Sequence, residues 1–151
     1  MSLPRAGEGK RGEKGHIAYL LRQAQAATRL ALDARLAAAH LTTPQFLVLN
    51  LLDAYPGASG AELARVAQAT PQTLNLIVRR LEREGLIARS EHETHGRMLR
   101  IQLTPAGRSR LRQCKRLADE VERKLLELID PGAEPKLRRW LSDVAAELIR
   151  E

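Results

Sequence analysis

The sequence has one cysteine, few aromatic residues and no long apolar run, and each scarcity excludes a class of protein. The single Cys114 rules out an intrachain disulfide framework and fits a reducing compartment, so we predict a cytoplasmic protein. No stretch approaches the ~20 apolar residues that span a membrane, and the polar N-terminus lacks the apolar run of a secretory signal. Aromatic residues make up only 3%. A core of Leu, Ala, Ile and Val is typical of a mostly helical protein.

Motifs of enzymes and metal sites are also scarce. The chain has no Gly-rich phosphate loop, no nucleophile elbow and no suggestive His-Asp-Ser grouping. We therefore predict that it is not an enzyme and uses no cofactor. His92 and His95 lie three residues apart among carboxylates, but zinc requires a third protein ligand and a fixed geometry. An exposed loop supplies neither, so we predict no metal site.

Basic residues outnumber acidic residues in the chain. Its 151 residues carry a formal net charge of +7, which favours polyanionic partners because Lys and Arg on phosphates release condensed counterions. Nucleic acid ranks first among such partners and an anionic membrane surface second. The length suits one compact domain.

Helical periodicity and capping signals predict a chain built mostly of helices. Residues 1–14 have little to bury and predict a flexible basic tail. Helical spacing of apolar residues then runs from 15 towards 36. Further helices are predicted to start with N-caps at Thr43, Ser59, Thr70 and Thr104. Proline follows three of these N-caps, and Glu62 gives the Ser59 start the spacing of a capping box. A last helix covers 137–148.

Two short segments with partial alternation, 86–89 and 98–103, predict strands joined by an exposed loop. A hairpin after three helices is the winged helix-turn-helix arrangement, in which the last short helix enters the major groove. We predict a mainly α (α+β) fold with one domain at 15–151. Within it, 43–103 form the winged helix-turn-helix, with the wing at 86–103. The flanking segments 15–42 and 104–151 are predicted dimerisation helices, because their apolar stripes exceed what the central domain covers.

An ordered set of short motifs makes the chain resemble the multiple-antibiotic-resistance regulator (MarR) family over about residues 15–150. The motifs are LTTPQF at 41–46, ELA at 62–64, TL at 73–74, RLE at 80–82, GLIAR at 85–89, GR at 96–97 and LTPAG at 103–107. The resemblance implies a homodimer with interlocked terminal helices that binds a pseudo-palindromic double-stranded DNA operator. It also implies release by a small molecule or by oxidation of a cysteine.

The predicted recognition helix has a polar face opposite its apolar stripe. Gln and Asn pair bidentately with adenine, Arg pairs with guanine, and a Thr methyl or a Leu side chain can meet a thymine methyl. The helix N-terminus also offers free backbone amides to a phosphate. An ordinary solvated helix face is the alternative. The candidate DNA-binding residues on this helix are Thr70, Pro71, Gln72, Thr73, Asn75, Leu76, Arg79 and Arg80. The family often has a basic residue where Leu76 stands and an acidic or polar one at Arg79.

The resemblance adds two arginines to the candidate DNA-binding residues. Arg97 matches the wing arginine that the family places in the minor groove, where A·T tracts concentrate negative potential. Many relatives have an Asp that braces this arginine, and this sequence has none near the wing tip. Arg89 matches the family arginine that ends the first strand and makes a structural or phosphate contact.

The resemblance also suggests where regulation occurs. The family's effector pocket lies between the dimerisation helices and the DNA-binding lobe, so Tyr19, Arg22, Arg29 and Phe46 are candidates to bind a phenolic or anionic ligand. Interface packing or a solvated helix face explains each of them equally well. Cys114 falls on an apolar stripe, where a thiol is inert, so we predict a core residue rather than a redox sensor.

Together these observations predict a homodimeric, sequence-specific DNA-binding regulator, a repressor released by a small molecule. A winged-helix architectural or protein-interaction module without a specific operator is the alternative. Base specificity separates the two, because a regulator prefers its operator over random duplex by ~10³-fold or more.

Overall fold

The computed structural model describes residues 2–91 and 99–149, and helices make up most of them. In chain order the elements are η1 (Gly9–Arg11), α1 (Ile17–Leu36), η2 (Ala37–Ala39), α2 (Thr43–Ala54), α3 (Gly60–Ala67), α4 (Pro71–Arg83), β1 (Ile87–Glu91), β2 (Leu99–Leu103), α5 (Pro105–Glu127) and α6 (Glu134–Leu148). Two antiparallel strands form the sheet, with Ile87 opposite Leu103 and Glu91 opposite Leu99. The predicted order of three central helices followed by a hairpin is confirmed.

Three of the four predicted helix starts have the predicted N-cap. Ser59 accepts a hydrogen bond from the Glu62 amide, and the Glu62 carboxylate accepts one from the Ser59 amide at 2.8 Å, which completes the capping box. The hydroxyls of Thr70 and Thr104 cap α4 and α5, each followed by a proline in the first turn. Local side-chain chemistry therefore determines where these helices begin.

The predicted N-cap of α2 at Thr43 is wrong, because the N-cap is Thr42. Its amide donates to Gln45 Oε1 at 3.0 Å, and its hydroxyl accepts from the Gln45 amide, so the capping box closes one residue earlier. The Thr43 amide is one of the unpaired donors of the first helical turn. It donates to Asp33 Oδ1 of α1 at 2.7 Å. A contact from another helix thus completes this N-terminus.

The core lies inside the lobe formed by α2, α3, α4 and the sheet. Its buried side chains come from every one of these elements and from α5. Backbone hydrogen bonds fasten the second strand at two points: the Ile101 amide, in the middle of the strand, donates to the carbonyl of Ala58 in the loop before α3, and the Thr104 amide, just after the strand, donates to the carbonyl of Leu86. The fully buried members of largest volume are Leu36, Leu49, Leu52, Leu63, Leu74, Leu81, Leu86, Ile87, Val48 and Cys114.

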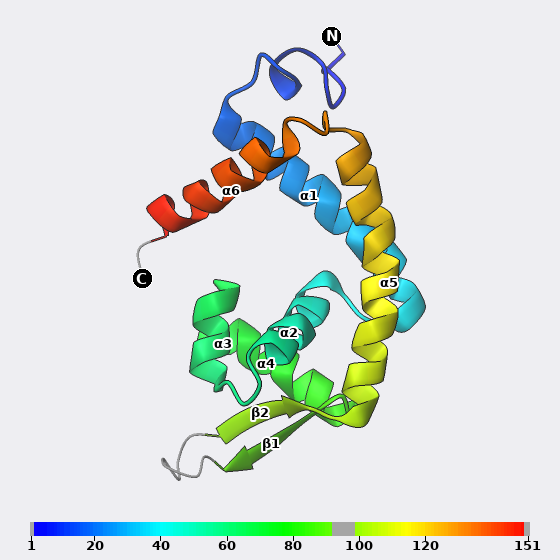
Figure 1. Cartoon of the computed structure of the whole chain (residues 1–151), viewed down its shortest axis with the longest axis vertical. Coiled ribbons are helices and arrows are strands. Elements are labelled where there is room, and N and C mark those ends of the chain that lie inside the picture. The colour runs from blue at the N-terminus through cyan, green and yellow to red at the C-terminus, as the bar shows by residue number, and fades with distance from the viewer. Residues whose placement is uncertain (1, 92–98, 150–151) are drawn as a thin grey trace.

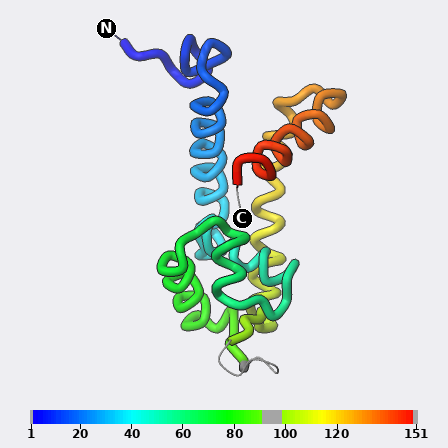
Figure 2. The backbone as a smooth tube through the Cα atoms, turned by 90° about the vertical axis from the view of Figure 1, so that its left-hand side faces the viewer, coloured from blue at the N-terminus to red at the C-terminus, as the bar shows by residue number. Residues whose placement is uncertain are grey.

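The two long helices extend from this lobe to the opposite end of the molecule (Figure 1). α1 and α5 pack against each other, and an ion pair at 2.9 Å joins Arg35 to Glu120. α6 follows the far end of α5 and turns back towards the lobe (Figures 1 and 2), and the end of this helix lines one hollow together with Gln68, which follows α3. The sheet lies at the lobe end of the molecule (Figure 1). None of the helices in the described part of the chain is sufficiently long and apolar to cross a membrane.

The N-terminal segment, for which we predict a flexible basic tail, has its own turn structure next to α1. It contains the short helix η1. Arg11 Nε donates to Gln23 Oε1 at 3.1 Å, and Gln23 Nε2 donates to the Arg11 carbonyl at 2.9 Å. Both bonds fasten the segment to the first turns of α1, far from the sheet (Figure 1).

Candidate nucleic-acid interface

Helix α4 separates its residues cleanly into a buried and an exposed side. Leu74, Val78 and Leu81 are buried in the core. We call the opposite side of α4 the reading face. All of its members are exposed, as predicted, and they are Gln72, Thr73, Asn75, Leu76, Arg79 and Arg80. This face holds amide, guanidinium and apolar groups, which are the groups that discriminate base edges in a major groove.

The N-terminus of α4 is capped and exposed. The Thr70 hydroxyl accepts from the Thr73 amide at 3.1 Å and donates to Thr73 Oγ1 at 3.0 Å. Pro71 occupies the first helical position, with Gln72 after it. Backbone amides at a helix N-terminus, together with the helix dipole, attract a phosphate. Thr70 and Pro71 therefore lie at an exposed helix N-terminus, with Thr73 engaged in the cap.

The three described candidate arginines differ in their partners. Arg80 Nε donates to Glu84 Oε1 at 3.2 Å, one turn along α4. The half-buried Arg89 of β1 forms an ion pair with Glu82 at 3.2 Å between Nε and Oε2. Arg79 forms no ion pair within residues 2–91 and 99–149. Of these three candidates, Arg79 is thus the one without an ion-pair partner among the described residues, whereas Arg89 pairs β1 with α4.

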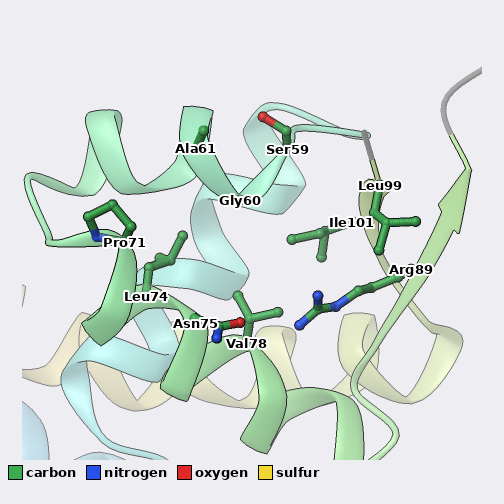
Figure 3. A pocket seen from close by; sticks show the side chains of 10 residues that line it. All are labelled: Ser59, Gly60, Ala61, Pro71, Leu74, Asn75, Val78, Arg89, Leu99 and Ile101. Atoms are coloured by element: carbon green, nitrogen blue, oxygen red, sulfur yellow. The ribbon is translucent and has the colours of Figure 1, made fainter. Parts of the chain in front are cut away.

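A shallow hollow of about 370 Å³ lies between α3, α4 and the sheet. Figure 3 shows Arg89 extending from β1 towards Asn75 and Val78, with Leu99 and Ile101 beside it. The hollow is lined by Ser59, Gly60, Ala61, Pro71, Leu74, Asn75, Val78, Arg89, Leu99 and Ile101. It therefore connects the N-termini of both helices of the helix-turn-helix with the base of the wing.

Sequence reasoning missed the contacts that attach the wing. The Glu82–Arg89 ion pair was detectable only as two charged residues on neighbouring predicted elements. The LTPAG motif has a structural explanation as well. The Thr104 hydroxyl donates to the Gly85 carbonyl at 2.6 Å, and buried Gly107 lies directly against the carbonyl group of Leu86. The motif thus forms the junction between the start of the wing and the start of α5.

The wing tip lies outside the described residues, and with it the predictions for Arg97, His92 and His95. Among residues 2–91 and 99–149, no three His, Cys, Asp or Glu side chains are grouped closely enough to hold a metal ion. Cys114 is fully buried, and burial raises the pKa of its thiol. The prediction that Cys114 is a core residue is confirmed.

The four effector candidates do not converge on one site within the protomer. Tyr19 and Arg29 are ten residues apart on α1, which is about 15 Å along a helix axis. Arg29 forms an ion pair with Asp33 at 3.7 Å, and Phe46 packs on the core. Asp33 in turn accepts from the Thr43 amide. Arg29 and Phe46 therefore each lie one turn from the hydrogen bond that joins α1 to α2, while Tyr19 and Arg22 lie two or more turns away.

Helix α6 leaves several large apolar side chains exposed, although Leu137 and Val144 are half-buried. It contains no buried residue. Trp140 is 38%, Leu141 45% and Leu148 78% exposed, and Leu128 at the end of α5 is 84% exposed. Monomeric proteins rarely expose apolar groups in such a cluster. α6 and the end of α5 therefore offer exposed apolar side chains that a second chain can cover.

A helix-turn-helix whose second helix exposes amides and arginines, followed by a two-stranded hairpin, defines a winged helix-turn-helix of the DNA-binding class. Comparison with known proteins agrees. The sequence model of the MarR family matches residues 41–98. The HTH-type transcriptional repressor Rv2887 of Mycobacterium tuberculosis is 32% identical over 131 residues, which are 87% of this chain and 94% of the repressor. The chain belongs to the MarR family.

Solved structures support the same assignment. The Mycobacterium tuberculosis protein Rv2887 in complex with salicylic acid has a TM-score of 0.70 at 32% identity, covering 87% of this chain and 98% of that one. The transcriptional repressor CouR, bound to a 23-mer DNA duplex, has a TM-score of 0.83 at 30% identity, covering 95% and 99%. The predicted winged-helix fold and the predicted family are both confirmed.

Proposed function

We propose that this protein is a homodimeric transcriptional regulator that binds a pseudo-palindromic double-stranded DNA operator and represses transcription until a small molecule releases it. The reading face of α4 carries this proposal, because six neighbouring residues there are exposed while the opposite side is buried. The proposal includes no catalytic activity. Since its partner is chromosomal DNA in a bacterial family, the protein acts in the cytoplasm.

The chemistry of the reading face suggests how the operator is recognised. Gln72 and Asn75 carry amides that pair bidentately with adenine, and the unpaired guanidinium of Arg79 suits guanine. Arg80, Arg89 and the amides near Thr70 are suited to phosphates, which position the protein without selecting a base. We assign Arg97 to the minor groove beside each half-site, where it would favour A·T pairs.

The homodimer explains the exposed apolar surface of α6. Two copies that meet through α1, α5 and α6 would bury Trp140, Leu141 and Leu148, which a single chain leaves exposed. The two α4 helices of such a dimer would enter successive major grooves, so half-sites should lie about one helical turn apart. CouR, a relative at 30% identity, has been solved on a DNA duplex.

Selection of bound duplexes from random DNA, followed by affinity measurements, tests the function. We expect an operator preferred over random duplex by ~10³-fold or more. Gln72→Ala should relax specificity at one base position by about 1–3 kcal/mol, and Gln25→Ala, which removes the same side chain from an exposed position on α1, should leave the base preference unchanged. Tight, salt-dependent binding without a preferred sequence would instead identify an architectural module.

We propose that the effector is a small aromatic anion, because Rv2887, a relative at 32% identity, was solved with salicylic acid. Arg29 and Phe46 are the best placed of the four candidates, since they flank the Asp33–Thr43 hydrogen bond between α1 and the DNA-binding lobe. An anion that pairs with Arg29 competes with Asp33 for this guanidinium, and the change at Asp33 is passed to α2 through the Thr43 amide. Salicylate should lower operator affinity more than neutral benzyl alcohol does, and Arg29→Gln should reduce that difference. Equal effects of the two compounds would contradict an anion site.

A further inference from the structure

Leu76 is an apolar side chain on a reading face that is otherwise polar. It is 68% exposed, and it is the one large apolar residue of α4 whose side chain is exposed. The neighbouring apolar residues of α4 are buried (Leu74 and Val78) or half-buried (Ile77). Leu76 therefore contributes nothing to the core, although it is hydrophobic.

Helical geometry places Leu76 at the centre of the reading face. Residues 72, 76 and 79 recur at spacings of four and three, so Gln72 and Arg79 are its neighbours on the same stripe. Leu76 and Arg79 also line one shallow surface hollow together with Glu82 and Arg83. If α4 enters the major groove with this stripe towards the bases, Leu76 meets base edges between the Gln72 amide and the Arg79 guanidinium, which form hydrogen bonds.

In the major groove, the apolar group that a base presents is the C5 methyl of thymine. Two exposed side chains on α4 carry methyl groups that could meet it, those of Thr73 and Leu76. The Thr73 side chain is held by the cap, because its Oγ1 accepts from the Thr70 hydroxyl at 3.0 Å. The Leu76 side chain has no such tie and extends further from the helix.

We propose that Leu76 specifies a thymine in each half-site through contact with the C5 methyl group. This inference rests on the proposed DNA-binding function and deepens it, because it assigns one base and one atom group to one residue. The specificity arises from apolar burial, so a cytosine or a deoxyuridine at that position lacks the group that Leu76 contacts.

The test pairs removal of the methyl group with removal of the side chain. In the selected operator, each thymine is replaced in turn by deoxyuridine in both half-sites, which deletes the methyl and keeps every hydrogen bond. Burial of one methyl is worth about a fourfold change in affinity. We therefore expect wild-type binding to weaken about fifteenfold at one symmetric pair of positions. In Leu76→Ala this loss should disappear, while preference for the operator over random duplex persists.

Two further variants test whether the loss depends on Leu76 and on its apolar reach. Val66→Ala removes an exposed apolar side chain from α3 and should retain the full deoxyuridine loss, whereas Leu76→Met should retain most of it because it preserves apolar reach. Operator binding that is insensitive to every deoxyuridine, or a loss that persists in Leu76→Ala, would overturn the inference and leave the proposed function intact. Failure to find any preferred sequence would overturn the proposed function, and this inference with it.

Discussion

Replacing Gly107 by alanine should destabilise the protein, although alanine is the better helix former. Gly107 is the third residue of α5, where helix propensity alone predicts a gain of up to about 1 kcal/mol. A Cβ at this position, however, would overlap the carbonyl oxygen of Leu86 and lie 2.9 Å from its carbonyl carbon. Both are backbone atoms, so neither can turn aside as a flexible side chain would.

The size of the effect follows from what must move. Forcing extra volume into a packed site destabilises by about 1–3 kcal/mol. The Leu86 carbonyl also accepts from the Thr104 amide at 3.1 Å, and losing such a bond removes about 1 kcal/mol. Subtracting the gain in propensity leaves a net loss of about 1–3 kcal/mol. For a protein of this length, Tm should fall by about 2–4 °C for each kcal/mol.

Gly60→Ala is the matched control. Gly60 is the first residue of α3, and a Cβ there meets no heavy atom within 4 Å. We expect this variant to be unchanged or slightly more stable. Urea unfolding followed by circular dichroism, at one fixed protein concentration because a dimer's stability depends on it, compares the two. A Gly107→Ala protein as stable as Gly60→Ala would refute the close-contact explanation of the LTPAG motif.

Three further predictions concern other contacts. The Thr43 amide lowers the pKa of Asp33, so the stabilisation from this carboxylate is present above its unfolded pKa of about 3.9 and is lost as pH falls through the lower folded pKa. Asp33→Asn should therefore be about 0.5–1 kcal/mol less stable than wild type at pH 7, and this difference should shrink as the pH is lowered in urea unfolding; a difference independent of pH would contradict the explanation. Trp140→Ala should raise the dimer dissociation constant about a thousandfold, because each protomer loses about 2 kcal/mol from apolar surface that the dimer buries. In the wild type, the fluorescence of this single tryptophan should shift to the red when dilution separates the dimer. Unaltered dimers of Trp140→Ala in sedimentation velocity would show that Trp140 is not in the interface. Cys114 should resist a thiol reagent at pH 7 until the protein unfolds, and rapid labelling of the native protein would show that the core opens there.

Most of the fold could be predicted from the sequence because the helix boundaries depend on residues that are neighbours in the chain. The Ser59–Glu62 capping box and the threonine caps before Pro71 and Pro105 are local, and each has the predicted form. The reading face of α4 could be predicted for the same reason. Its two sides differ in polarity at helical spacing, and burial follows that pattern.

The contacts between elements are what the sequence did not determine. The sequence predicts Thr43 as the cap of α2, whereas Thr42 caps it, because Gln45 closes the capping box with Thr42 and Asp33 of another helix accepts from the Thr43 amide. Arg89 looks like Arg79 in the sequence, yet Glu82 of α4 pairs with Arg89. The net positive charge, which first suggested a nucleic-acid partner, therefore does not indicate which arginine is available to contact DNA. Capping and periodicity act over three or four residues, whereas pairing and close packing depend on distances that only the folded chain brings about.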